Sequence, residues 1–236
     1  MGHTRPVVMI TGAGRGIGRA TALAFAAAEY TVVLAELRRT LGRRAERMLR
    51  REGATAQFLQ TDVARGASVA RATRAVLRRF GRLDCVVNNA GVLEVGSLVD
   101  LPVTHMDRML SVNLRGPLLV TRAVLPALLR RGAGSIINVA SQLGTYGAAE
   151  YATYCATKFG VVGFTQALAA ELAGTGVRTW AVCPGLVDTA MARRAVGVGP
   201  RERAALLRPE AVARVIVDLA TGRRRVASGA AVDVGR

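Results

Sequence analysis

Tyr154 and Lys158 form the residue pair in this sequence that is best suited to moving a proton. They are four residues apart, so a helix would carry both side chains on one face. Lys158 is the one lysine among 33 lysines and arginines, which favours a site that needs a compact ammonium rather than a planar guanidinium. A surface lysine left over in an arginine-biased composition is the alternative. A free tyrosine has a pKa of about 10, and a nearby ammonium favours its phenolate, so the pair could exchange a proton with an alcohol or a carbonyl group.

Two further polar residues could act beside this pair. Ser141 ends an apolar run typical of a buried strand, at the carboxyl edge where open parallel sheets bind ligands. We expect its hydroxyl to polarise a substrate oxygen beside Tyr154, although it could also simply form a turn. Asn113 lies inside a long helical pattern, where asparagine is unfavourable because it prefers caps and turns. Either a function or a local irregularity of the helix would explain it.

The segment TGAGRGIG at 11–18 has the features of a dinucleotide-binding turn. It follows a β-branched run and opens a helical pattern, so its glycines would allow a tight turn and the helix N-terminus would offer free N–H groups to a pyrophosphate. The acid Glu36, at the end of the next predicted strand, supplies the context that this motif requires. The binding residues predicted in the turn are Gly12, Gly14, Arg15, Gly16, Ile17 and Gly18.

The charges around this turn give conflicting indications of which dinucleotide is bound. Glu36 is placed to accept both ribose hydroxyls of NAD and to repel the additional phosphate of NADP. Arg15, Arg38 and Arg39 favour the opposite preference, because each could pair with that phosphate. We predict NAD rather than NADP. Asp62, after the third predicted strand, could accept a hydrogen bond from the adenine amino group or cap the helix that follows.

Short β-branched runs alternate with longer helical patterns along the whole chain. This alternation predicts an α/β fold, with a parallel sheet covered by helices on both faces, in one domain at 1–236. The predicted strands are 7–10, 31–35, 56–60, 85–87, 135–139, 178–182 and 230–234. The predicted helices are 17–28, 39–51, 68–80, 104–131, 151–173 and 209–220. The stretch 190–208 is irregular and basic, so we expect a flexible flap over a substrate site there.

In these residues the sequence resembles the short-chain dehydrogenase/reductase family over nearly its whole length. TGAGRGIG resembles the family's TGxxxGxG loop, NNAG at 88–91 resembles the motif after its fourth strand, and YCATK at 154–158 resembles its YxxxK. Asn113, Ser141 and the PGLVDT segment at 184–189 follow in the family's order. The resemblance implies a doubly wound Rossmann-type sheet of about seven strands and NAD(P)(H)-dependent alcohol/carbonyl chemistry. It also implies a homotetramer or homodimer built on the long fourth and fifth helices.

The resemblance further implies roles for individual residues. Tyr154 is the acid/base, and Lys158 supports it while holding the nicotinamide ribose. Ser141 polarises the substrate oxygen, and Asn113 holds a water that passes protons to Lys158. The other cofactor-binding residues are Asp62, Val63, Asn89, Ala90, Gly91, Pro184, Gly185, Val187 and Thr189. The predicted substrate pocket consists of Gln142, Leu143, Tyr151, Leu186 and Met191.

The formal net charge of +17, with arginine clusters at 38–51 and 71–82, invites a nucleic-acid interpretation. Few aromatics accompany the arginines and no nucleic-acid-binding signature is present, so we interpret them as solvated helix faces and expect no specific nucleic acid. Cys85, Cys155 and Cys183 lie in apolar segments without pairing or metal-ligand spacing, so we expect buried thiols and no metal. No apolar segment approaches about 20 residues and no signal-peptide pattern opens the chain, so we expect a cytoplasmic protein without membrane contact.

Three functions remain open from the sequence. The first is an NAD-dependent oxidoreductase acting on a small-molecule secondary alcohol or ketone. The alternative is an NADPH-dependent 3-oxoacyl-acyl-carrier-protein reductase, because the basic surface suits an acidic carrier protein, although Glu36 counts against it. The third is a non-catalytic dinucleotide- or nucleic-acid-binding module. Tyr154 and Lys158 are both present, which counts against a non-catalytic role.

Overall fold

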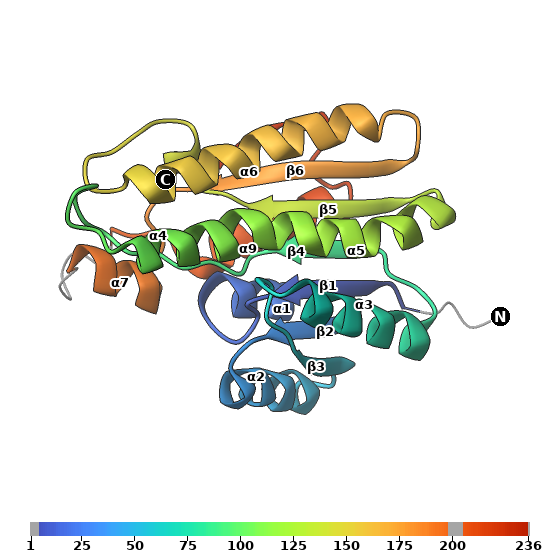
Figure 1. Cartoon of the computed structure of the whole chain (residues 1–236). Helices are drawn as coiled ribbons and strands as arrows, with labels where there is room; N and C mark the ends of the chain where they lie inside the picture. The colour runs from blue at the N-terminus through green and yellow to red at the C-terminus, as the bar shows by residue number, and fades with distance from the viewer. Residues whose placement is uncertain (1–4, 198–204, 236) are drawn as a thin grey trace.

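Seven parallel strands form one sheet in the computed structural model, which describes residues 5–197 and 205–235. The strand order β3-β2-β1-β4-β5-β6-β7 is doubly wound about β1 and β4, as the sequence predicts (Figure 1). The strands are β1 (Val7–Thr11), β2 (Thr31–Glu36), β3 (Ala56–Gln60), β4 (Cys85–Asn88), β5 (Gly134–Val139), β6 (Val177–Pro184) and β7 (Ala231–Val234). The predicted α/β fold class is therefore confirmed, and β6 extends beyond the predicted strand at both ends.

Helices cover both faces of this sheet. The helices are α1 (Gly16–Ala27), α2 (Arg39–Arg51), α3 (Gly66–Phe80), α4 (Val103–Met109), the π-helical η1 (Leu110–Arg115), α5 (Gly116–Arg131), the 3₁₀-helical η2 (Gln142–Gly144), α6 (Ala152–Glu171), α7 (Ala190–Val196) and α9 (Pro209–Ala220). In β1, Val8 and Ile10 join the core under α1 and α9, whereas Val7 and Met9 join the core under α3 and α5. Because both faces are buried, the strands are almost continuously apolar.

The predicted helix 104–131 is not a uniform α-helix. It consists of α4, one π-helical stretch at η1, and α5. Pro117 stands at the start of α5 and has no N–H to donate to the carbonyl of Asn113, its partner four residues earlier in an α-helix. The missing hydrogen bond accounts for an irregularity at this point. The unfavourable position of Asn113 in the sequence pattern therefore marks a real departure from α-helical geometry.

The helical stretch Val103–Arg131 is also long and apolar enough to cross a membrane by length and composition alone. The expectation that no segment reaches this length is therefore wrong. In the structure the stretch packs against the sheet, and Val120, Val124 and Leu128 of α5 are fully buried in its core. We interpret it as a core helix of the fold.

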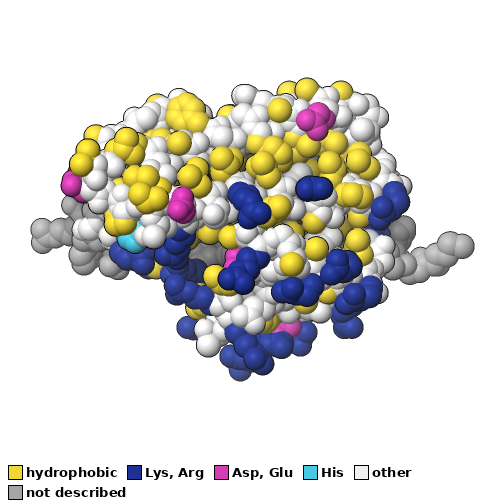
Figure 2. Space-filling view, in the orientation of Figure 1, with side chains coloured by type: hydrophobic (Ala, Val, Ile, Leu, Met, Phe, Trp, Pro, Cys, Tyr) yellow, Lys and Arg dark blue, Asp and Glu magenta, His cyan; other side chains and the backbone are white. Residues whose placement is uncertain are grey.

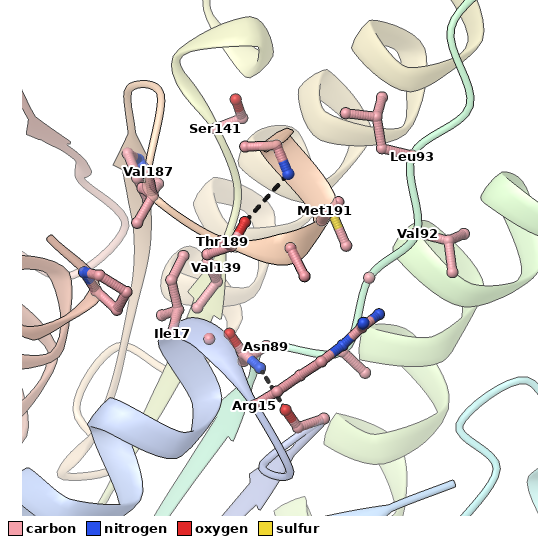
Figure 3. A pocket seen from close by; sticks show the side chains of 18 of the residues that line it. Arg15, Ile17, Asn89, Val92, Leu93, Val139, Ser141, Val187, Thr189 and Met191 are labelled. Carbon is pink, nitrogen blue, oxygen red and sulfur yellow. Dashed lines mark hydrogen bonds between the residues drawn. The ribbon is translucent and has the colours of Figure 1, made fainter. Parts of the chain in front are cut away.

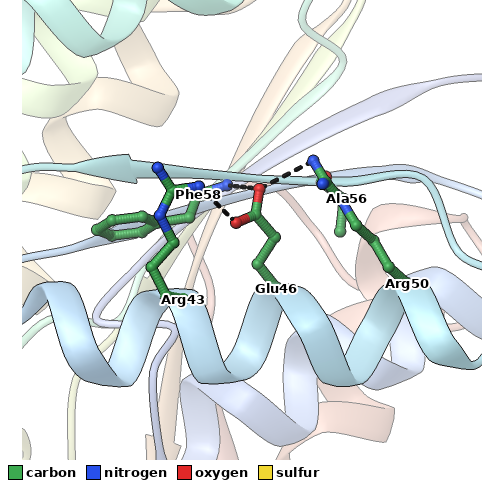
Figure 4. A network of polar contacts seen from close by, with 5 residues as sticks. All are labelled: Arg43, Glu46, Arg50, Ala56 and Phe58. Atoms are coloured by element: carbon green, nitrogen blue, oxygen red, sulfur yellow. Dashed lines mark hydrogen bonds and ion pairs between the residues drawn. The ribbon is translucent and has the colours of Figure 1, made fainter.

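Part of the basic character of α2 has a structural role at the edge of the sheet (Figure 4). Glu46 accepts hydrogen bonds from the Phe58 N–H (3.1 Å) and from Arg43 (2.8 Å), and pairs with Arg50 (2.9 Å). Arg50 also donates to the carbonyl of Ala56 (3.0 Å). Burial alone would raise the pKa of Glu46, but the Phe58 hydrogen bond and the two arginines outweigh it and hold the pKa below its usual value. Arg43 and Arg50, which the sequence predicts as solvated, thus take part in the contacts between α2 and β3 through Glu46 and Ala56.

Three smaller expectations can be compared with the structure. All three cysteines are free and buried, as predicted, and burial raises the pKa of the Cys85 thiol. The described residues contain no group of three or more metal-ligating side chains that could hold an ion. The predicted flap is not irregular throughout, because α7 (Ala190–Val196) forms its first part. Residues 198–204 of that flap lie outside the described residues.

Candidate active site

A cleft of about 1050 Å³ opens at the carboxyl edge of the sheet. Residues that follow four neighbouring strands line it: Gly12 after β1, Asn89 after β4, Ser141 after β5 and Gly185 after β6. Figure 3 shows side chains from these segments around one space. The place is the one where open parallel sheets bind ligands, because the strand order reverses there.

The turns after β1 and β4 are locked together by main-chain and side-chain hydrogen bonds. The Asn89 carboxamide donates to the carbonyls of Thr11 (2.9 Å) and Gly12 (3.2 Å). The Thr11 hydroxyl accepts from the N–H groups of Asn89 (2.9 Å) and Ala90 (3.0 Å). Gly12 has φ +63°, and a Cβ there would lie 2.9 Å from the Cα of Ala90. Glycine is therefore required, both for the backbone conformation and for the close approach of the two turns.

The glycine loop fits a pyrophosphate at the start of α1. The N-cap residue Arg15 makes no side-chain capping bond and the first turn contains no acid, so the first N–H groups of the helix are available to an anion. A Cβ on Gly16 would lie 3.2 Å from Thr189, so the segment after β6 closes on the same space. Gly14 and Gly18 are not among the cleft-lining residues. They permit tight packing behind the loop instead.

Glu36 lines the cleft at the end of β2, as expected, with 8% of its surface exposed. Its two oxygens accept hydrogen bonds from the N–H groups of Gly14 (3.1 Å) and Arg38 (2.9 Å). A carboxylate has further lone pairs, so it can still accept from a ribose. Arg15 and Arg38 also line the cleft, and neither forms an ion pair with a carboxylate of the described residues. Arg39 is not part of the lining.

Asp62 and Val63 line the same end of the cleft after β3. Asp62 accepts from the N–H of Ala64 (3.0 Å) and lies 3.4 Å from Arg65, so it stabilises a local turn. The alternative role of Asp62 as the cap of the next helix is wrong, because the N-cap of α3 is Arg65. The position of Asp62 at the cleft remains compatible with a contact to an adenine amino group.

Tyr154 and Lys158 lie one turn apart on α6 and both line the cleft. The Lys158 ammonium lies 5.5 Å from the centroid of the Tyr154 ring and donates to the carbonyl of Val139 (2.9 Å). The Ser141 hydroxyl lies beside the Tyr154 phenol in the cleft, near enough to lower its pKa. The Ser141 hydroxyl oxygen also accepts from the N–H of Leu143 (3.1 Å), which caps η2. The structure therefore brings the predicted hydroxyl, phenol and amine together.

The electrostatics of this group differ from the expectation for Tyr154. Burial raises the pKa of Tyr154 to about 12, and the neighbouring Ser141 hydroxyl offsets only part of that effect. Burial lowers the pKa of Lys158 to about 8. Burial of the phenol thus opposes the expected effect of the ammonium, which is to favour the phenolate. At neutral pH Tyr154 is a protonated phenol, ready to donate.

Asn113 does not line the cleft but lies directly behind it, with 1% of its surface exposed. Its carboxamide accepts from the N–H of Val92 (2.8 Å) and donates to the carbonyl of the same residue (2.8 Å). It also donates to Thr157 on α6 (3.4 Å). The side chain thus ties η1 to the loop after β4 and is not free to hold a water. Pro117, four residues on, has no N–H to donate to the main-chain carbonyl of Asn113.

A comparison with known protein families agrees with this geometry. Residues 6–196 match the family model described as short chain dehydrogenase. The chain belongs to the short-chain dehydrogenase family. The relatives of this short-chain dehydrogenase include enzymes of several names. It is 35% identical to 2-(S)-hydroxypropyl-CoM dehydrogenase 3 of Xanthobacter autotrophicus, over 97% of this chain and 94% of that protein. It is 43% identical to a putative ketoacyl reductase of monensin polyketide synthase from Streptomyces virginiae, over 81% of this chain and 74% of that protein.

A solved structure of the same family resembles this short-chain dehydrogenase closely. The 3-ketoacyl-(acyl-carrier-protein) reductase from Brucella melitensis, complexed with NADH, superposes with a TM-score of 0.88 at 31% identity. The alignment covers 97% of this chain and 96% of that one. The protein described here is therefore an oxidoreductase of the alcohol/carbonyl type, with a fold that in this relative holds a nicotinamide dinucleotide.

The cleft of this short-chain dehydrogenase collects almost all residues that the sequence indicates. Besides the residues discussed above, the lining includes Ile17, Gly91, Pro184, Val187, Gln142, Tyr151, Leu186 and Met191. Thr189 also lines it, while its hydroxyl accepts from the N–H of Ala192 and caps α7 (3.2 Å). Sequence analysis missed the hydrogen bonds between Thr11 and Asn89. The position of Thr11 at the end of β1, beside the glycine turn, could have indicated them. Sequence analysis also missed Val139, because a main-chain acceptor leaves no signal in residue types.

Proposed function

We propose that the protein interconverts a small secondary alcohol and a ketone with NAD(H), using Tyr154 as the proton donor and acceptor. The observation that carries this proposal is the group of Tyr154, Ser141 and Lys158, which lines the same cleft as the glycine loop that fits a dinucleotide. Bound nicotinamide supplies the hydride acceptor or donor. The protein supplies the proton, the orientation and the shielding from water.

In the direction of ketone reduction, Tyr154 donates its proton to the substrate oxygen. A pKa of about 12 keeps the phenol protonated at neutral pH, and the neighbouring Ser141 hydroxyl can bind the same oxygen. In the direction of alcohol oxidation, Tyr154 must lose its proton first. The positive charge on Lys158 then stabilises the phenolate, because the ammonium lies 5.5 Å from the ring.

We propose that Lys158 also connects the bound cofactor in the cleft with a water molecule in the protein interior. Its ammonium donates to the carbonyl of Val139, and two of its three N–H donors remain for a ribose hydroxyl and a water. The main-chain carbonyl of Asn113 is the proposed partner of that water. This arrangement would return a proton to Tyr154 after each turnover.

We propose NAD over NADP because Glu36 occupies the ribose end of the cleft and is held there by two main-chain N–H groups. A 2′-phosphate would have to approach this carboxylate in a partly desolvated place. Arg15 and Arg38 line the same end without a carboxylate partner among the described residues, and they support the second candidate, an NADPH-dependent 3-oxoacyl-acyl-carrier-protein reductase.

We also propose a homo-oligomer. Exposed apolar side chains on η1, α5 and α6, namely Leu110, Leu118, Leu129 and Phe159, offer a surface for a second copy. Figure 2 shows hydrophobic side chains gathered over α5 and α6, whereas Lys and Arg side chains dominate the lower half over α2 and α3. The domain limits of 1–236 and the cytoplasmic location stay predictions from the sequence.

A panel of small secondary alcohols and ketones, assayed at the nicotinamide absorbance with NAD(H) and with NADP(H), tests the proposal. We expect turnover that depends on Tyr154 and is more efficient with NAD(H). Turnover that is faster with NADPH, and confined to 3-oxoacyl thioesters, would replace this proposal by the second candidate.

A further inference from the structure

Gln142 is a polar side chain that lines the cleft, and a hydrogen bond within the protein sets its orientation. Gln142 follows Ser141 directly and starts η2. Its carboxamide nitrogen donates to a carboxylate oxygen of Asp233, on β7, at 2.9 Å. Ser141 follows β5 and Asp233 lies within β7, so the contact joins the edge of the substrate site to the last strand of the sheet.

This hydrogen bond determines which end of the carboxamide faces the cleft. Asp233 is a carboxylate and can only accept, so it must face the amide nitrogen of Gln142. The opposite orientation would bring the amide oxygen against the carboxylate and lose a charge-assisted hydrogen bond. The Gln142 Oε1 atom is therefore directed away from Asp233.

The position of Oε1 is defined by Gly185. A Cβ built on Gly185 would lie 3.0 Å from the Gln142 Oε1, so this oxygen rests over the glycine backbone after β6. Both residues line the cleft, whereas no described residue donates a hydrogen bond to Oε1. The cleft thus presents an oriented acceptor that is free to bind a ligand.

The surroundings of this acceptor are mostly apolar. The substrate half is lined by Leu93, Leu143, Leu186 and Met191, besides Tyr151. Gln142 lines the same cleft as Ser141 and Tyr154, which would bind the substrate oxygen. A hydrogen-bond donor on the carbon beside the reacting carbon would meet Oε1.

We propose that Gln142 selects substrates with a hydroxyl on the carbon next to the reacting carbon, that is, vicinal diols and α-hydroxy ketones, with Asp233 as its positioning residue. This inference rests on the proposed alcohol/ketone function and names its substrate class. It also separates the two candidate functions. A 3-oxoacyl thioester carries a second carbonyl, which is an acceptor and gains nothing from Oε1.

The test compares two ketones that differ by one hydroxyl, 1-hydroxy-2-butanone and 2-butanone, with NADH. We expect the wild type to favour the hydroxy ketone by about tenfold in kcat/KM, the effect of one hydrogen bond in a partly open site. Gln142→Met keeps the length of the side chain and removes the acceptor, so the ratio should fall to about one. Gln166→Met, the same exchange on α6 at a residue that does not line the cleft, is the matched control and should keep the ratio.

Asp233→Ala tests the positioning role, because it frees the carboxamide to rotate. The ratio should then fall below the wild-type value while remaining above that of Gln142→Met. A wild-type ratio near one, or a ratio that survives in Gln142→Met, would overturn the inference. An unchanged ratio in Asp233→Ala would overturn the role given to Asp233.

If the wild type reduces neither ketone with either cofactor, the proposed function fails, and ligand binding then decides the inference separately. Calorimetric titration of the NADH-loaded protein compares 1,2-butanediol with 2-butanol. Tighter binding of the diol that is lost in Gln142→Met supports the inference. Equal binding of the two alcohols contradicts it.

Discussion

Replacing Lys158 by methionine should stabilise the folded protein near neutral pH, even though it removes a group needed for turnover. Burial lowers the pKa of Lys158 from 10.5 to about 8, so holding the ammonium in the folded protein costs about 3 kcal/mol, at about 1.4 kcal/mol per pKa unit. The hydrogen bond to Val139 returns about 1 kcal/mol that methionine would lose. We therefore expect the variant to be more stable by about 2 kcal/mol at pH 7, a rise in Tm of roughly 4–8 °C.

The pH dependence gives this prediction a specific signature. Between pH 8 and 10.5 the unfolded chain binds more protons at Lys158 than the folded protein does, so the stability of the wild type rises with pH relative to the variant. The cost of the ammonium is fully present below pH 8 and disappears above pH 10.5. The advantage of Lys158→Met should therefore shrink across this window, and above it the variant should be less stable by about 1 kcal/mol, because only the lost hydrogen bond to Val139 remains.

Urea unfolding at a series of pH values, followed by the fluorescence of Trp180, measures this difference. Trp180 is the one tryptophan of the chain and is 1% exposed, so its emission reports loss of the core. Thr157→Val, one residue before Lys158 and fully buried, is the control and should change stability by the same amount at every pH. If Lys158→Met were less stable than the wild type at pH 7, with a difference independent of pH, Lys158 would not be a desolvated ammonium.

Three further changes test the site. Lys158→Arg keeps the charge but places planar donors near Val139, so kcat should fall at least about 100-fold. Wild-type rates across the pH range would show that the ammonium is not required. Glu36→Gln preserves the shape of the side chain and removes its charge, so the dissociation constant of NADPH divided by that of NADH should fall. Glu36→Ala should lower this ratio at least as much. A wild type that binds NADPH more tightly than NADH would contradict this reasoning. Asn89→Ala removes two hydrogen bonds to the turn after β1, so stability should fall by about 1–3 kcal/mol and NADH should bind more weakly, whereas unchanged binding would show that the turn keeps its shape without Asn89.

The parts of the site that could be predicted from the sequence are those that depend on residue type and spacing. Tyr154 and Lys158 share a helix face because of their offset, and the glycine loop is recognisable because only glycine allows Gly12 to approach Ala90. Features that depend on the surrounding packing could not be predicted. The raised pKa of Tyr154 follows from burial, and the acceptor of Lys158 is a main-chain carbonyl that any residue at position 139 would provide.

The same distinction applies to the fold. The strands could be located from their apolar runs, but the break in the helix 104–131 required both Pro117 and the packing of Asn113 against Val92. Asn113 is predicted to hold a water that passes protons to Lys158, and the structure adds that its carboxamide holds two elements together. An asparagine in a helical pattern indicates an irregularity, but does not show which of its atoms is used.

The most direct measurement of the central claim compares the wild type with Tyr154→Phe. The initial rate of NADH oxidation is measured with the best ketone of the panel, together with the dissociation constant of NADH for both proteins. We predict that the rate falls at least about 100-fold while the dissociation constant changes by no more than about threefold, because only the oxygen that transfers the proton is removed. A Tyr154→Phe variant that retains most of the wild-type rate would show that Tyr154 is not the acid/base of this enzyme.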